Sequence, residues 1–148
     1  MDYNTLSEKE QIKFVKEDGY LIKFIDKPSE KVKITAVRQN GFSIQFIEYP
    51  SDEIQFESIK QNGLSIQFIK DPLEKIKLQA VKQNGLLLYY IKNPSEEVQL
   101  AAIKENTWSI KFIDKPSEKI QLEAVKQNKR IIEYIKNPSE EVKNLLKK

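Results

Sequence analysis

The segment Asn93-Pro-Ser-Glu-Glu-Val98 recurs unchanged as Asn137-Pro-Ser-Glu-Glu-Val142. All prolines of the 148-residue chain belong to variants of this segment and are spaced 22 residues apart, at Pro28, Pro50, Pro72, Pro94, Pro116 and Pro138. The glycines keep the same interval, at Gly19, Gly41, Gly63 and Gly85. Because a fixed period of 20–50 residues is the signature of repeat architectures, the sequence predicts a tandem-repeat protein.

We predict a single repeat domain over residues 1–148. Its six copies cover 14–35, 36–57, 58–79, 80–101, 102–123 and 124–145, preceded by an N-terminal half-repeat or cap at 1–13 and followed by a basic tail at 146–148. A 22-residue unit cannot bury its apolar face alone, whereas stacked neighbours can bury a continuous core. The copies are therefore expected to stack.

The proline segment of each copy is predicted to open a helix that continues into the start of the next copy, since proline suits the first helical position. Asn93 is a candidate N-cap with Glu96 as its capping-box partner, and elsewhere the serine can take that role. The copy with Leu73 in place of serine has Asp71 as a possible cap. In most copies the helix is predicted to end at Asn-Gly, with a residue in the left-handed region.

The second element of each copy has an ambiguous pattern. In Leu64-Ser-Ile-Gln-Phe-Ile69, the apolar residues alternate as in a strand but also fit one face of a helix. We favour a helix, because Gln67 and Lys70 are good helix formers and the preceding turn is tight. The predicted fold class is all-α, a short α-solenoid of six 22-residue helix-turn-helix repeats. The alternative is an α/β horseshoe-like solenoid.

Composition excludes several classes of function. The chain has no cysteine and no histidine, which removes disulfides, thiolate chemistry, imidazole bases and histidine metal ligands. It also has no phosphate-binding loop, nucleophile elbow or dinucleotide fingerprint. We therefore expect no enzyme activity, no catalytic residue, no metal and no cofactor. The polar N-terminus and the lack of a long apolar run predict a cytoplasmic protein without a membrane span.

The segments Ala80-Val-Lys-Gln-Asn-Gly-Leu86 and Asn93-Pro-Ser-Glu-Glu-Val98 resemble the short helical tandem repeats of unknown function found in bacterial and phage proteins. The resemblance covers nearly the whole chain. It implies an α-solenoid scaffold and no particular active site. The composition, rich in lysine, asparagine and isoleucine, is similar to that of proteins from AT-rich bacterial or phage genomes.

Three apolar residues stand where the other copies have mostly polar ones: Tyr49, Leu73 and Tyr89. Single exposed apolar residues are ordinary, but exposed aromatic residues are enriched at binding hot spots. Around Tyr49, the second copy carries a net charge of −3. We predict a partner-binding site made of Tyr49, Leu73 and Tyr89 with a charged rim of Glu48, Asp52 and Glu53. The predicted function is a protein–protein interaction module. A narrower hypothesis is a phage or mobile-element inhibitor of a bacterial defence protein.

The alternative function is binding of nucleic acid by a ladder of cations, one from each copy: Lys16, Arg38, Lys60, Lys82, Lys104 and Lys126. Such a row could follow a phosphate backbone. A structural explanation is favoured, because these residues are predicted in the last helical turn, where cations offset the helix dipole. The partner's identity and the oligomeric state are not determined by the sequence.

Overall fold

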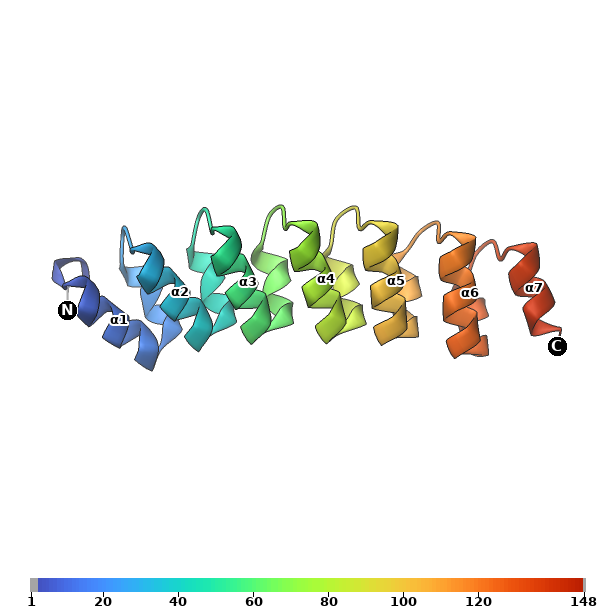
Figure 1. The fold of residues 1–148 in the computed structure, drawn as a ribbon, viewed down its shortest axis with the longest axis horizontal. Helices are drawn as coiled ribbons and strands as arrows, with labels where there is room; N and C mark the ends of the chain where they lie inside the picture. Colours follow the sequence, from blue (N-terminus) through green and yellow to red (C-terminus); the bar gives the residue numbers. More distant parts are fainter. Residues whose placement is uncertain (1–2, 148) are drawn as a thin grey trace. The chain divides into compact units, whose positions relative to one another are not determined.

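The computed structural model describes residues 3–147; residues 1, 2 and 148, which belong to the expected half-repeat and tail, lie outside the described residues. The described part contains α-helices and 3-10 helices and no strand. It divides into two compact units, unit 1 at residues 1–76 and unit 2 at residues 77–148. We describe each unit by itself (Figure 1).

The helices alternate along both units. Unit 1 contains η1 (Tyr3–Thr5), α1 (Glu8–Glu17), η2 (Gly19–Phe24), α2 (Glu30–Gln39), η3 (Gly41–Phe46), α3 (Asp52–Gln61), η4 (Gly63–Phe68) and the start of α4 (Glu74–Gln83). Unit 2 contains the rest of α4, η5 (Gly85–Tyr90), α5 (Glu96–Glu105), η6 (Thr107–Phe112), α6 (Glu118–Gln127), η7 (Lys129–Tyr134) and α7 (Glu140–Leu146). The predicted all-α solenoid class is confirmed, and the horseshoe alternative is wrong for the described residues.

The second element of each copy is a six-residue 3-10 helix, which is tighter than an α-helix. The asparagine before it serves two helices at once. Asn40 ends α2, where its N–H donates to the Ala36 carbonyl at 2.9 Å, and its side chain accepts from Phe42 N–H at 3.0 Å to cap η3. A single residue, Asn40, therefore separates the two helices.

Serine is the N-cap of the α-helices whose caps are described. Ser95, for example, accepts a hydrogen bond from Val98 N–H at 3.2 Å. The prediction that Asn93 caps this helix is wrong. Asn93 instead adopts a positive φ of 47°, the only such value at a non-glycine residue among those described. Asparagine tolerates this left-handed conformation better than most residues.

The predicted left-handed helix stop is also wrong, since no glycine in the described part has a positive φ. Glycine is needed there because the next copy approaches closely. A Cβ on Gly41 would lie 2.6 Å from the Ser58 carbonyl oxygen, and one on Gly19 would lie 2.5 Å from that of Ala36. Residue 107 has the same register and is threonine, so this backbone can adjust to a Cβ at that copy.

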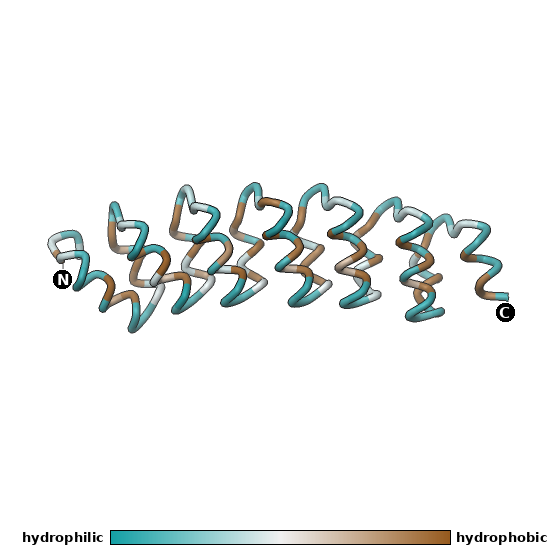
Figure 2. The backbone as a smooth tube through the Cα atoms, in the orientation of Figure 1, coloured by the Kyte–Doolittle hydropathy of each residue, from teal (hydrophilic) through white to brown (hydrophobic). Residues whose placement is uncertain are grey.

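The core repeats with the same period. Each α-helix from α2 to α6 buries two or three apolar side chains, and each 3-10 helix from η2 to η7 buries at least one, as with Ile44, Ile54 and Ile59 in unit 1. In unit 2 the cluster consists of Ile103, Ile110, Ile120, Ala124, Val125, Ile131, Ile135 and Val142. Figure 2 shows apolar segments on both kinds of helix within each unit. Each copy thus completes its core with side chains from its neighbours.

Candidate protein-binding surface

Tyr49 and Glu48 lie in the turn between η3 and α3, and both are exposed. The Tyr49 side chain is 83% exposed, the largest value among the exposed large apolar residues. Both residues line a hollow of about 380 Å³ whose other lining residues are Ile25, Asp26, Lys27, Pro28, Lys33, Phe46 and Ile47. The register argument therefore placed Tyr49 correctly on the surface, and the structure adds a concave neighbourhood.

Asp26 and Glu48 are two acids in equivalent positions of adjacent copies. In unit 2 the equivalent positions hold Asp114 and Lys136, and the Lys136 ammonium donates to the Asp114 carboxylate at 3.2 Å. At this register unit 2 thus has an ion pair between Asp114 and Lys136, whereas unit 1 has like charges at Asp26 and Glu48, followed by Lys70 in the next copy. Asp26 was not among the predicted site residues, although its place 22 residues before Glu48 could have revealed it.

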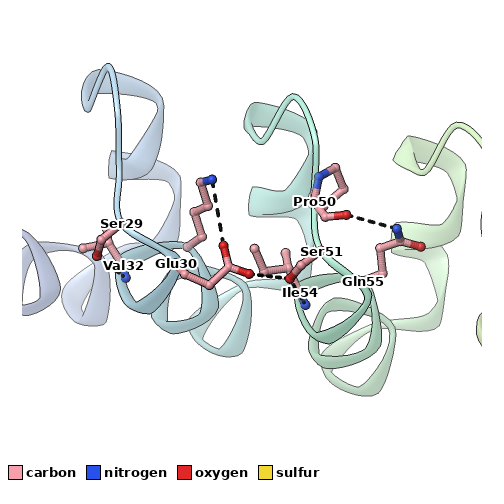
Figure 3. A network of polar contacts seen from close by, with 8 residues as sticks. Ser29, Glu30, Val32, Pro50, Ser51, Ile54 and Gln55 are labelled. Carbon is pink, nitrogen blue, oxygen red and sulfur yellow. Dashed lines mark hydrogen bonds and ion pairs between the residues drawn. The ribbon is translucent and has the colours of Figure 1, made fainter.

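Leu73 occupies the position of the capping serine and is 44% exposed. Serines here also connect neighbouring copies. The Ser51 hydroxyl donates to the Glu30 carboxylate (Figure 3). The Ser117 hydroxyl donates to the Glu96 carboxylate in the same way. By this register residue 73 lies beside Asp52, but a leucine has no oxygen with which to cap or donate. The Asp52 carboxylate instead accepts a hydrogen bond from the Lys75 ammonium at 3.3 Å.

Glu53 belongs to a different charge network from Asp52. The Arg38 guanidinium donates through Nε to Glu57 at 2.9 Å, and the charge of Glu53 adds to this attraction. The hydrogen bond from Arg38 holds the pKa of the Glu57 carboxyl below its ordinary value, against partial desolvation and with help from the charges of Arg38 and Lys60. The ion pair of Arg38 is thus made with Glu57, which lies outside the predicted rim, while the charge of Glu53 acts on the same guanidinium.

Tyr89 lies in unit 2, on η5 rather than in a proline turn. Its side chain is 66% exposed, which agrees with the register argument. Its ring contacts those of Tyr90 and Phe112 edge to face, with centroid distances of 5.0 and 5.3 Å. That Tyr89 acts together with Tyr49 and Leu73 in one site remains a prediction.

The predicted cation ladder lies in the last turns of the α-helices. Its members are exposed side chains of successive helices from α1 to α6: Lys16, Arg38, Lys60, Lys82, Lys104 and Lys126. A first-turn acid stands at the other end of each of these helices, for example Glu30 in α2. This arrangement is the one that offsets the helix dipole. Arg38 also forms an ion pair with Glu57, so the charge of this member of the ladder is already paired within unit 1.

A row of half-exposed aromatic side chains was missed by the sequence argument. Every 3-10 helix from η2 to η7 ends in an aromatic residue that is 40–48% exposed: Phe24, Phe46, Phe68, Tyr90, Phe112 and Tyr134. The expected helical pattern placed Phe68 and Ile69 on the same face. In the structure Phe68 is 40% exposed, whereas Ile69 is 7% exposed. The recurrence of an aromatic residue every 22 positions was the available signal.

Residues 3–147 contain no group of three or more histidine, cysteine, aspartate or glutamate side chains that could hold a metal ion. None of the helices described is long and apolar enough to cross a membrane. Comparison of the chain with protein-family models, with curated proteins and with solved structures finds no match. The surfaces themselves must therefore support any functional argument.

Proposed function

We propose that unit 1 is a protein-binding module that takes up a basic segment of its partner. Its binding surface is the Tyr49 edge, which we define as Asp26, Glu48 and Tyr49 with the hollow between them. The observation that carries the proposal is the pair of acids at Asp26 and Glu48, where unit 2 has the Asp114–Lys136 ion pair. A lysine or arginine of the partner supplies the missing cation.

Tyr49 gives such a cation an apolar neighbour. The stem of a lysine or arginine can pack on an aromatic ring while its charged end meets carboxylates. Lys27 and Lys33 also line the hollow, but the Lys33 ammonium lies 4.0 Å from the Glu30 carboxylate. Because the second copy as a whole carries a net charge of −3, a positively charged segment is the complementary partner.

Leu73 extends the proposed surface toward the next copy. Replacing a capping residue with an apolar one typically costs about 1 kcal/mol of stability. Leu73 is 44% exposed, so packing of its side chain in the core offsets little of that loss of stability. A role in binding, as an apolar contact for the partner beside Asp52, accounts for a leucine at this position.

The test is a display selection of random peptides on the full chain, followed by binding measurements on the enriched peptides by fluorescence anisotropy. We expect the enriched peptides to carry a net positive charge. Tyr49→Asn, which installs the residue found at positions 93 and 137, should weaken their binding about thirtyfold, as for a hot spot of ~2 kcal/mol. Glu48→Lys should weaken it further because it supplies the cation internally.

Lys115→Asn is the matched control, since it makes the same side chain at the same register in unit 2 and should leave binding unchanged. Neutral or acidic peptides, or basic peptides that bind the Tyr49→Asn variant as tightly as the parent, would refute the proposal. Loss of binding on changing Lys16 and Lys60 to glutamine, with Tyr49→Asn silent, would favour the cation ladder instead. The geometry favours no particular partner, so the hypothesis of an inhibitor of a bacterial defence protein stays a prediction.

A further inference from the structure

The second surface is the aromatic face of unit 2, defined as Tyr89, Tyr90, Trp108, Phe112 and Tyr134 on η5, η6 and η7. These side chains are 40–66% exposed. Their rings contact one another within and between copies: Tyr89 contacts Tyr90 and Phe112, and the Trp108 and Tyr134 centroids lie 5.2 Å apart. The face thus presents a series of partly uncovered rings on successive 3-10 helices.

Cations accompany these rings. The Lys111 ammonium lies 4.5 Å from the centroid of Trp108 and 4.1 Å from that of Tyr134. Lys129 and Arg130, both exposed, begin η7, the helix that ends in Tyr134. Unit 2 carries 14 basic and 9 acidic residues, a net charge of +5. An anionic partner is therefore favoured over a neutral one.

Unit 1 differs at these positions although its 3-10 helices have the same register. At the register of Lys111 unit 1 has one cation, Lys23, whose ammonium lies 4.8 Å from the Phe24 centroid. The other two positions hold Gln45 and Gln67, whose amides donate to the carbonyls of Phe42 and Leu64 at 3.0 and 3.2 Å. Unit 1 carries 11 basic and 13 acidic residues, a net charge of −2. Unit 2 thus differs from unit 1 by the exposed rings of Tyr89 and Trp108 and by its net positive charge, neither of which the repeat requires.

We propose that the aromatic face of unit 2 binds single-stranded nucleic acid. Single strands expose the flat faces of their bases, which stack on aromatic side chains, while lysine and arginine contact the phosphates. A duplex hides those base faces, so the half-exposed rings give it no comparable contact. Lys111 stabilises Trp108 and Tyr134 in the unbound chain and moves to a phosphate when a base stacks. This surface is separate from both the Tyr49 edge and the cation ladder.

Trp108 is the only tryptophan of the chain, so its fluorescence reports on this face alone. The experiment titrates the full chain with a 15-residue oligothymidylate at 50 and 200 mM salt and follows tryptophan emission and oligonucleotide anisotropy. We expect quenching that follows the anisotropy and binding that weakens as salt rises. A duplex of mixed sequence and an oligoglutamate peptide are the comparison ligands, and both should bind more weakly.

The variants restore residues that other copies have at the same register: Tyr89→Gln, Trp108→Leu and Lys111→Gln. Each aromatic change should weaken single-strand binding about 5- to 150-fold, the range of one lost base stack. Lys111→Gln should lower the slope of log affinity against log salt by about 0.7. The double variant Lys104→Gln and Lys126→Gln removes two cations of the α-helical ladder and serves as the matched control, with at most a small uniform loss expected.

Circular dichroism should confirm that all variants stay folded. Equal binding of duplex and single strand, or loss of binding in the ladder variant but not in Tyr89→Gln and Trp108→Leu, would overturn the proposal in favour of simple charge attraction. Tighter binding and stronger quenching by oligoglutamate would overturn it in favour of an acidic protein partner. No detectable binding of the oligothymidylate at 50 mM salt would also overturn it.

Discussion

Unit 1 and unit 2 have the same alternation of helices but opposite surface chemistry. At one pair of register positions unit 1 has Asp26 and Glu48, whereas unit 2 has an ion pair between Asp114 and Lys136. At one register of the 3-10 helices unit 1 has Lys23, Gln45 and Gln67, whereas unit 2 has Tyr89, Lys111 and Glu133. Because the scaffold accepts either choice, packing does not dictate these residues. Differences between copies at exposed positions are therefore the best guide to function in this chain.

The largest expected effect tests whether the two units are stabilised separately. Gly41→Ala would push a Cβ against the Ser58 carbonyl oxygen in unit 1, and Gly85→Ala would meet that of Ala102 in unit 2. Overpacking of this kind costs about 1–3 kcal/mol. Hydrogen exchange followed by mass spectrometry should show faster exchange mainly in the unit that carries the change. The reason is that each repeat is stabilised by contacts with its nearest neighbours alone.

Thr107→Ala is the control for this comparison, since residue 107 already has a Cβ and the change should cost little. Uniform loss of protection over residues 3–147 after Gly41→Ala would mean that the two units unfold as one. In that case the two compact units would not have separate free energies of unfolding.

An intermediate effect concerns residue 73, where leucine takes the place of the capping serine. Leu73→Ser should give α4 the serine N-cap seen in the other α-helices and a hydroxyl that donates to the acid of the preceding copy, as Ser51 does to Glu30. We expect a gain of about 1 kcal/mol and a rise of roughly 2–4 °C in the melting temperature. Ser117→Leu, the reverse change in unit 2, should lower the melting temperature by a similar amount. A Leu73→Ser variant that melts below the parent would mean that Leu73 contributes to the core.

The smallest expected effect exchanges the charge pairs of the two units. Glu48→Lys places a cation opposite Asp26 and should raise stability by about 0.2–1 kcal/mol at low salt, the range for an exposed ion pair. Lys136→Glu, which creates two acids in unit 2, should lower it by a similar amount. Both differences should shrink at 1 M salt because surface charges are screened. Chemical denaturation at two salt concentrations measures them, and a destabilised Glu48→Lys variant would contradict the proposed like-charge contact.

Much of the fold follows from local sequence rules. The proline spacing gave the repeat, and the serine and asparagine positions gave the places where helices begin and end. The details of capping did not follow, because Asn93 and Ser95 are both good caps by composition. The choice between them depends on backbone geometry before Pro94. The left-handed stop was wrong for a related reason, since glycine is required at Gly41 by contact with the next copy.

The sequence by itself determined the period and the exposure of Tyr49, Leu73 and Tyr89, because repetition allows each position to be compared with its equivalents in the other copies. Only the tertiary structure decided which charges meet. Glu53 and Asp52 are neighbours in the chain, yet the charge of Glu53 acts on Arg38 while Asp52 pairs with Lys75. It also decided that the aromatic end of each 3-10 helix stays half exposed. Such contacts join residues about 20 positions apart on adjacent copies, and the register of that stacking is set by packing of the core.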